Sequence, residues 1–530
     1  MLAGLDLGIV VVYALVLFGL AQWVSRERDG HQKDATDYFL AGKSLPWWAI
    51  GASLIAANIS AEQIIGQSGQ GYVVGLAIAA YEWQAAIVLL IVAKYFLPIF
   101  LKREIYTMPQ FLQTRYGTGV KTLMSFYWIV LYTAVNLATV LWLGALAIES
   151  LTGVAVFPAM AGLAAFAVLY SLYGGLKAVA LTDIVQVTIL IIGGLAITWI
   201  ALDAVSAGQG AGAGLERLST EVPGHFAMIL DESHPSYGDL PGIWTLLGGL
   251  WVLHFSYWGF NQYIIQRALG AESLQEAQKG LAFAAFLKLL IPVIVVIPGI
   301  AALVLAQDGV LSAELLDDKS DRTYGSLMGM APEGLRGLIF AALIAAIVSS
   351  LASMMNSIAT IFTMDIYRQY STSARSEGHY VTVGRVVAVV AMVVALLLAQ
   401  PFLGGMASAF QTIQEYTGFI APGVVTIFLL GFFYARANEA SAYAVLIGSV
   451  VGSVVLKIVL PDLPFVLRIW LVFLINLALG VMVARLTAAP SNDQPVALAD
   501  IDFGTTAGFN RAAVVVTLLL ALIYVAFWSA

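Results

Sequence analysis

Charged residues are scarce along this whole chain, and this scarcity limits its possible folds more than any motif does. Only 25 basic and 32 acidic residues occur among 530, whereas 60% of the residues are hydrophobic. A soluble globular domain is about 25% charged, and its surface needs polar groups that this chain lacks. The composition therefore excludes a soluble enzyme, a disordered chain and a nucleic-acid-binding protein. It indicates a polytopic membrane protein.

Missing residue types narrow the available chemistry further. The chain has no cysteine, which excludes disulfides, iron–sulfur clusters, thiol catalysis and cysteine-based zinc sites. Its five histidines show no metal-ligand spacing, and no nucleotide-binding motif is present. We therefore expect a protein that is not an enzyme.

Fourteen stretches are long and apolar enough to cross a bilayer as helices, which takes about 20 residues. Their approximate limits are 5–25, 46–68, 72–100, 121–151, 156–174, 178–204, 242–268, 276–307, 334–369, 380–401, 404–433, 438–460, 465–486 and 510–529. The sequence thus predicts an all-α membrane protein of fourteen transmembrane helices that form a single domain over 1–530. The first helix, 5–25, and the helices of 438–529 are expected to be peripheral.

The basic residues are distributed unequally between the two sides of the membrane that the fourteen predicted helices would cross. If the N-terminus lies outside, Lys and Arg fall roughly three times as often on the inside. No Lys or Arg precedes the first stretch, and Arg26 and Arg28 follow it, so we expect a retained helix and not a signal peptide. Both termini are predicted outside. The long connections 205–241, 308–333 and 487–509 are expected to be solvated loops.

The second stretch carries a polar cluster in its middle. Its members, with the glycines that follow, are Asn58, Ser60, Glu62, Gln63, Gly66, Gly69 and Gly71. Polar residues inside a membrane are costly and indicate a functional site by default. The cluster favours a discontinuous helix that lines a cavity, although Asn and Ser can also bind neighbouring helices together.

A carboxylate and a lysine lie in two further stretches. Glu82 is an acid in apolar sequence and needs a partner, and Lys288 is the only lysine that we place inside a span. The two could pair, either as part of a binding site or as a structural ion pair. Pro292 and Pro298 are expected to loosen the helix that carries Lys288.

The stretch 242–268 places four residues on one helix face, because their spacing is i, i+3, i+4 and i+7. They are His254, Tyr257, Trp258 and Asn261. Aromatic faces are often packed core, but the added His and Asn favour a cavity lining. We do not expect His254 to bind a metal.

Oxygen groups that suit a cation occur in 334–369, where Ala346, Ser349 and Ser350 share a face. Such small residues also allow close helix packing. Alternatively, their hydroxyls and carbonyls could coordinate sodium, which as a hard cation needs oxygen ligands. In a different stretch Asp183 could lie on an ion path or pair with Lys177.

Five segments carry a pattern typical of one transporter family. They are DYFLAGKSLPWWAIGASLIAANISAEQ, YGGLKAVALTDIVQ, YWGFNQYIIQR, AAIVSSLASMMNS and FQTIQEYTG. They closely resemble the solute:sodium symporters, and especially their sodium/glucose-type sugar branch, in register over essentially the whole chain. The resemblance implies two inverted five-helix repeats with discontinuous helices, here 46–204 and 242–433.

The resemblance also implies roles for single residues. The implied sodium site consists of the carbonyls of Ala56, Ile59 and Ala346 and the hydroxyls of Ser349 and Ser350, with Asp183 on the sodium exit path. The implied sugar site consists of Gln63, Glu82, Lys288 and Gln414, with Tyr257 as an inner gate whose hydroxyl Asn58 holds. Tyr81 and Phe410 match an outer hydrophobic gate.

Three positions depart from the pattern of the family's bacterial sugar transporters. His254 replaces a sugar-binding asparagine, Ala85 replaces a serine, and Gln67 replaces an outer-gate methionine. Such changes can alter which sugar fits, because an unpaired buried polar group costs about 1–3 kcal/mol. The implied cation site shows no departure.

The sequence thus predicts a symporter that imports a neutral, galactose- or glucose-like hexose with co-transported sodium by alternating access. Its expected place is the bacterial inner membrane, and its expected partners are the sugar, sodium and lipid, with no nucleic acid. Sodium symport of inositol, proline or another organic solute is the alternative within the family. Coupling to protons instead of sodium also stays open.

Overall fold

The computed structural model describes residues 2–25, 43–105, 107–312, 320–372, 375–406, 408–487 and 498–529. Apart from an isolated bridge between Leu45 and Ala271, these residues form helices and no strand. The α-helices are α1 (Gly4–Ser25), α3 (Trp47–Asn58), α4 (Ser68–Val73), α5 (Ala80–Ile91), α6 (Leu97–Lys102), α7 (Met108–Tyr116), α8 (Thr118–Val130), α9 (Ala138–Thr152), α10 (Val156–Val205), α11 (Ala211–Glu221), α12 (Ile243–Leu247), α13 (Leu250–His254), α14 (Gln262–Leu269), α15 (Leu274–Lys288), α16 (Ile291–Gln307), α18 (Thr323–Gly329), α19 (Leu335–Thr360), α20 (Arg368–Tyr370), α21 (Glu377–Leu403), α22 (Ala409–Thr417), α23 (Ala421–Phe433), α24 (Glu439–Val459), α25 (Phe465–Leu486) and α26 (Ala507–Ala526).

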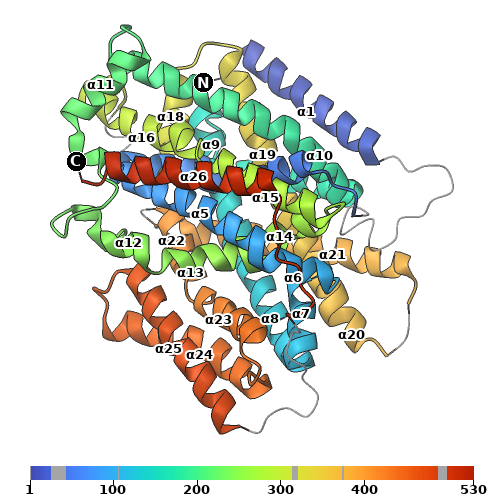
Figure 1. Ribbon diagram of the computed structural model, residues 1–530. Coiled ribbons are helices and arrows are strands. Elements are labelled where there is room, and N and C mark those ends of the chain that lie inside the picture. The colour runs from blue at the N-terminus through green and yellow to red at the C-terminus, as the bar shows by residue number, and fades with distance from the viewer. Residues whose placement is uncertain are drawn as a thin grey trace.

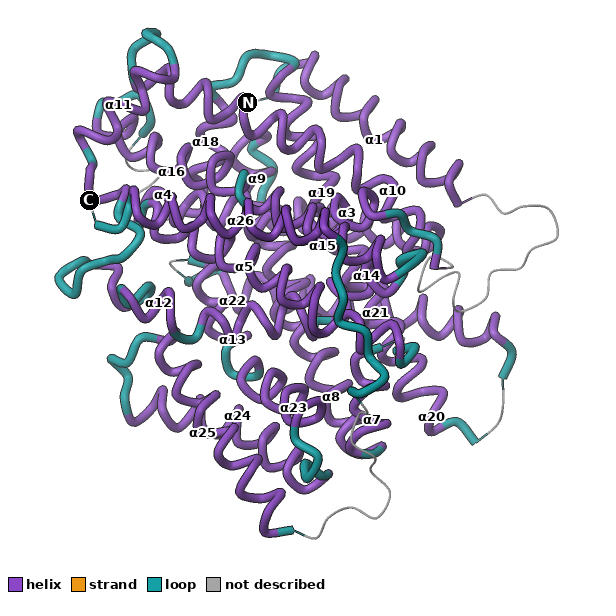
Figure 2. Tube along the Cα trace, in the orientation of Figure 1, coloured by secondary structure: helices purple, strands orange, loops and turns teal. Residues whose placement is uncertain are grey.

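Shorter π and 3₁₀ turns join or interrupt these helices. The π turns are η2 (Glu62–Gln67), η4 (Val92–Phe96), η5 (Leu131–Leu137), η8 (Phe255–Gly259) and η10 (Ile361–Tyr367), and the 3₁₀ turns are η3 (Leu76–Ala79), η6 (Pro223–Phe226), η7 (Pro235–Gly238) and η9 (Ser320–Arg322). Figure 1 shows α1 at one edge of the bundle and α24 with α25 at the opposite edge, while α26 crosses α5 and α15. The tube in Figure 2 shows how often the helices of the bundle are interrupted.

Helix occurs at each of the fourteen predicted stretches, but fourteen complete spans are not confirmed. Ten helices of the described residues are long and apolar enough to cross a membrane, or eleven if the bent pair in 47–73 counts as one span. Two of the remaining stretches, Gly4–Leu17 and Val156–Ser171, are shorter apolar helices. The third, 242–268, is divided into short helices.

The predicted spans 156–174 and 178–204 together form one helical element, α10, of 50 residues. However, the hydroxyls of Tyr170 and Thr182 are hydrogen-bonded, although twelve residues of a straight helix span about 18 Å. The element therefore bends sharply between these two residues, so its two arms run in different directions.

The predicted break in 46–68 results from side chains that replace the hydrogen bonds of the helix. α3 ends at Asn58, and the Ser60 N–H donates to the Asn58 carbonyl (2.9 Å) and to Gln63 Oε1 (3.3 Å) instead of the Ala56 carbonyl. The Glu62 N–H donates to the Ser60 hydroxyl (3.3 Å). Such local bonds compete with a continuous helix, and the helices on the two sides are inclined by 61°.

A second break lies in 242–268, before α14. Asn261 has an extended backbone and caps α14, because its Oδ1 accepts a hydrogen bond from the Tyr263 N–H (3.2 Å). The same oxygen accepts from the hydroxyl of Tyr132 (2.8 Å), which in turn accepts from the Gln262 N–H (3.0 Å). η5 is thereby fixed to the start of α14.

Pro292 separates α15 from α16, as the sequence predicts. Proline has no N–H for the carbonyl four residues before it, which here belongs to Lys288, the last residue of α15. Pro298 lies inside α16 and causes no break. Lys288 is therefore held at a helix end and is only 1% exposed.

Two connections that were expected to be solvated loops are partly helical, and in 308–333 the described residues from Ser320 onwards are also largely buried. The expectation of a solvated loop was therefore wrong for 308–333. The connection 205–241 contains α11, and 308–333 contains η9 and α18. In η9, Asp321 is buried, and its Oδ2 accepts a hydrogen bond from the N–H of Ala409, which begins α22 (3.2 Å). The backbone of Ser320 packs against Gly69, where no Cβ would fit. In the third connection, 488–497 lies outside the described residues.

Candidate functional site

A cavity in the interior of the bundle brings together the polar residues singled out from the sequence. The room between its side chains for the centre of a water-sized sphere is about 60 Å³, which is space for a few water molecules. Its lining includes all seven residues expected to bind the solute, namely Asn58, Gln63, Glu82, His254, Tyr257, Lys288 and Gln414, and the expected gate residues Gln67, Tyr81 and Phe410. The two helix breaks and the end of α15 all contribute to this lining.

Glu82 and Lys288 form a buried ion pair in the wall of the cavity. Lys288 Nζ donates to the Glu82 carboxylate and to Asn58 Oδ1, and it lies 4.7 Å from the centre of the Trp258 ring. Gln67 Nε2 donates to the other carboxylate oxygen of Glu82 (2.7 Å). A buried pair is tolerated only with further hydrogen bonds to its members, and these neighbours supply them.

Asn58 links this ion pair to the expected inner gate. Its Nδ2 donates to the Tyr257 hydroxyl (3.2 Å), as expected, and the Tyr263 hydroxyl donates to the same oxygen (2.8 Å). A continuous chain of polar contacts therefore runs from Gln67 to Tyr263. We call it the gate-to-gate chain; its members are Gln67, Glu82, Lys288, Asn58, Tyr257 and Tyr263.

Several buried polar atoms of the lining have no hydrogen-bond partner in the part of the chain that the structure describes. They are Glu62 Oε1, Gln67 Oε1, Tyr81 Oη, Asn136 Oδ1 and His254 Nε2. Buried polar atoms are normally hydrogen-bonded, and an unpaired one costs about 1–3 kcal/mol. The cavity is thus prepared to bind a polar solute with many hydrogen-bonding groups.

The lining also contains residues that the sequence analysis did not assign to the site. Asn136 comes from η5 and Thr417 from α22, while Glu62, Trp258 and Asn261 were noted only as parts of motifs. Asn136 is an amide within an apolar helix, and this signal alone could have identified it.

The two residues expected to form the outer gate touch each other in the lining of the cavity. The rings of Tyr81 and Phe410 pack edge to face, with centroids 5.2 Å apart. Gly66 allows this packing, because a Cβ there would lie 2.8 Å from the Cβ of Phe410. Gln70 joins α4 to the start of α22, since its Nε2 donates to the Ser408 hydroxyl (3.1 Å) and its Oε1 accepts from Gln411 (3.0 Å).

The residues expected to bind the cation lie where α3 ends against α19. Ala56, Ile59, Ala346, Ser349 and Ser350 are all 0% exposed. The Ser350 hydroxyl donates to the Ala57 carbonyl (3.2 Å), and the Ser349 hydroxyl donates to Asp183. Both serines thus direct their hydrogens to acceptors and keep oxygen lone pairs for a cation.

Asp183 pairs with Arg267, a partner that the sequence analysis missed. Its Oδ2 accepts from Ser53 (2.6 Å) and from Arg267 Nη2 (3.4 Å), and both partners of the ion pair are fully buried. Arg267 also donates to Ser53 (2.7 Å) and Ser353 (2.8 Å). The side chain of Lys177, the alternative partner, lies outside the described residues.

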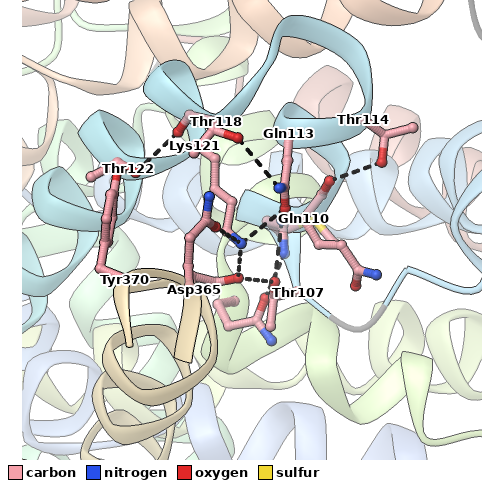
Figure 3. Close-up of polar contacts among 12 residues, drawn as sticks. Thr107, Gln110, Gln113, Thr114, Thr118, Lys121, Thr122, Asp365 and Tyr370 are labelled. Atoms are coloured by element: carbon pink, nitrogen blue, oxygen red, sulfur yellow. Dashed lines mark hydrogen bonds and ion pairs between the residues drawn. The ribbon is translucent and has the colours of Figure 1, made fainter. Parts of the chain in front are cut away.

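A second buried polar cluster lies at the start of α8 (Figure 3). Lys121 Nζ lies 3.3 Å from Asp365 Oδ1 and donates to Gln113 (2.9 Å) and Gln369 (2.7 Å). The Thr107 hydroxyl donates to the same Asp365 oxygen (3.3 Å). The cluster fastens η10 to α7 and α8, about 15 Å along the helix from the part of η5 that lines the cavity.

Comparison with known sequences gives a consistent set of relatives. The profile of the sodium:solute symporter family matches residues 38–452. A sodium/glucose cotransporter of Vibrio parahaemolyticus is 48% identical over 538 residues, which cover 99% of both chains. Sodium/glucose cotransporter 4 of Danio rerio is 33% identical over 85% of this chain and 71% of its own. Sodium/myo-inositol cotransporter 2 of Oryctolagus cuniculus is 32% identical over 83% of this chain and 67% of its own.

Comparison with solved structures supports the fold. A Na⁺-coupled sialic acid symporter, solved in a substrate-bound outward-open state, superposes with a TM-score of 0.78 at 22% identity and covers 92% of this chain and 99% of its own. A nucleobase-cation-symport-1 transporter superposes with a TM-score of 0.55 at 15% identity, over 90% and 97% of the two chains. At these identities the likeness concerns the arrangement of helices alone.

Proposed function

The chain belongs to the sodium:solute symporter family, and we therefore propose that it imports a neutral, glucose- or galactose-like sugar together with sodium by alternating access. The observation that carries the choice of a sugar is the cavity, whose lining combines an ion pair, amides and unpartnered polar atoms. Sugars carry many hydroxyls, each of which both donates and accepts a hydrogen bond. Such a solute can satisfy the lining without introducing a charge of its own.

Gln63, Glu82, Lys288, Gln414 and His254 are the proposed contacts to the sugar. Lys288 and the two glutamine amides can donate to sugar oxygens, whereas Glu82 and His254 Nε2 can accept from sugar hydroxyls. Tyr257 with Asn58 is the proposed inner gate, and Tyr81, Phe410 and Gln67 are the proposed outer gate. The contact between the rings of Tyr81 and Phe410 supports the assignment of these two residues to the outer gate.

The proposed sodium ligands are the carbonyls of Ala56, Ile59 and Ala346 and the hydroxyls of Ser349 and Ser350. The Ser60 N–H donates to the Asn58 carbonyl and not to the Ala56 carbonyl. The Ala56 carbonyl therefore lacks its usual helical donor, which supports its assignment as a sodium ligand. Ser350 touches Ala57, the residue before Asn58, so the cation position adjoins the residue that binds both Lys288 and Tyr257. If the helix break has two arrangements and sodium binds one of them more tightly, sodium shifts the equilibrium towards that arrangement. We place Asp183 on the path by which sodium leaves.

Two inverted repeats over 46–204 and 242–433 are part of the proposal. The breaks in their first segments, 46–68 and 242–268, support it. We also propose that the protein resides in a bacterial inner membrane with both termini outside and catalyses no reaction.

Sodium symport of myo-inositol is the second candidate. It is favoured by the similarity to sodium/myo-inositol cotransporters. It is also favoured by the lining of the cavity, whose polar groups suit any neutral polyol. The hydroxyls of inositol could satisfy the same unpartnered atoms.

Uptake by proteoliposomes tests both candidates. We expect uptake of radiolabelled galactose or glucose to require an inward sodium gradient, and a panel of hexoses, myo-inositol and proline to rank the competitors. If inositol alone competes, the second candidate replaces the first. Equal uptake on a proton gradient without sodium contradicts sodium coupling, and the absence of uptake with any sugar contradicts the sugar proposal.

A further inference from the structure

Glu62 is a carboxylate in the cavity lining whose side chain has no role in the contacts described so far. It is 5% exposed, its Oε1 is buried without a hydrogen-bond partner, and none of the ion pairs among the described residues includes it. We propose that Glu62 contacts the transported sugar directly, as the acceptor of a hydrogen bond from one sugar hydroxyl, and thereby determines which pattern of hydroxyls is transported. This inference rests on the proposed sugar symport.

The position of Glu62 fits this role because the helix break directs it to the cavity. It begins η2, directly after the break and directly before Gln63. Glu62 lines the same cavity as Tyr257, the proposed inner gate. The lining thus has a second carboxylate besides Glu82, next to the proposed inner gate.

A purely structural role does not account for this side chain. The break is stabilised by the backbone N–H of Glu62, which donates to the Ser60 hydroxyl, and not by its carboxylate. The cation in the lining, Lys288, is already bound by Glu82 and Asn58. A carboxyl oxygen without a hydrogen-bond partner is costly to bury, and a donor group of a bound solute offsets this cost.

The chemistry of the lining indicates which donor this is. A carboxyl group offers an oxygen that accepts a hydrogen bond whether it is ionised or protonated. A sugar hydroxyl can donate to this oxygen, whereas a fluorine in place of that hydroxyl cannot. A site built to bind a hydroxyl strongly rejects an analogue that lacks it. Glu62 should therefore distinguish a hydroxyl from a fluorine at one position of the sugar ring.

Competition by monodeoxyfluoro sugars, measured in proteoliposomes, tests the proposal. With the wild-type protein, we expect one of the fluorinated analogues to compete on the order of tenfold less well than the parent sugar. This analogue lacks the hydroxyl that donates a hydrogen bond to Glu62. Glu62→Met removes both acceptor oxygens with a side chain of similar length, so its discrimination against that analogue should largely disappear. The ranking of the other analogues should be unchanged. Glu216→Met, at an exposed glutamate of α11, is the matched control and should keep the wild-type profile.

The outcomes separate this inference from the function beneath it. If wild-type protein takes up sugar and Glu62→Met shows the wild-type profile across the series, the role of Glu62 is contradicted and sugar symport stands. If wild-type protein takes up no sugar, both proposals fail. Should Glu62→Met not fold, Glu62→Asp replaces it, because this change keeps the carboxyl group but withdraws its oxygens by about 1.5 Å. Unaltered discrimination by Glu62→Asp then also contradicts the proposal.

Discussion

Ser350 shows how a single hydroxyl can serve two purposes at the end of α3. Its hydrogen is directed to the Ala57 carbonyl, and its oxygen is left for the proposed sodium ion. We expect Ser350→Ala to weaken sodium activation of sugar uptake on the order of tenfold, because one ligand is removed. Uptake measured against sodium concentration checks this. Ser453→Ala, in α24, removes a buried hydroxyl that has no hydrogen-bond partner among the described residues. This control should leave the dependence of uptake on sodium concentration unchanged. If Ser350→Ala also leaves it unchanged, the sodium site is misassigned.

Gln414 and Lys288 are both proposed to bind the sugar, but their substitutions should differ in effect. Gln414 is partly exposed in the cavity lining, so Gln414→Ala should abolish uptake and leave thermal stability nearly unchanged. Lys288→Ala leaves Glu82 buried without its cation, which costs about 3–5 kcal/mol, and should lower the melting temperature as well. Uptake and thermal unfolding in detergent measure the two effects. Normal uptake by both variants would remove both residues from the sugar site.

At the scale of elements, the contact between η9 and α22 is sensitive to pH. Burial raises the pKa of Asp321 to about 7, although the N–H of Ala409 opposes this shift. The folded state therefore retains a proton that the unfolded chain releases near its ordinary pKa of 3.8. Stability is highest below that value and falls as the pH rises towards 7.

Asp321→Asn should remove this dependence. The variant imitates the protonated side chain, so we expect it to be more stable than wild-type protein at pH 8 and equally stable near pH 4. Melting temperatures across this range measure the difference. Parallel curves for the two proteins would show that Asp321 does not titrate as described.

The positions of the helices could be predicted because a long apolar run has few alternatives in a bilayer. The break near Asn58 was also predictable, since local polar side chains cause it. The pairing of Asp183 with Arg267 was not, because it depends on packing between segments that are 84 residues apart. Burial of Asp321 was missed for the same reason: its polarity suggests a solvated loop, and only the approach of Gly69 and α22 shows otherwise.

For the whole molecule, the proposed transport cycle moves net positive charge with each neutral sugar. One charge that crosses 100 mV yields about 2.3 kcal/mol, which supports roughly fiftyfold accumulation. We expect an inside-negative potential to raise sugar accumulation at equal sodium concentrations on both sides. Valinomycin-imposed potassium potentials in proteoliposomes measure this. Accumulation that ignores the potential would contradict net movement of charge.

The gate-to-gate chain has one more consequence. Lys288 binds Asn58, and Asn58 binds Tyr257, so a sugar oxygen that accepts the third N–H of Lys288 is connected to the tyrosine through the asparagine. Sugar and gate are then linked through one ammonium group. By reciprocity of binding free energies, any change that loosens Tyr257 from Asn58 must also alter how tightly the sugar is held. Retention of the sugar and release of the gate are therefore a single equilibrium.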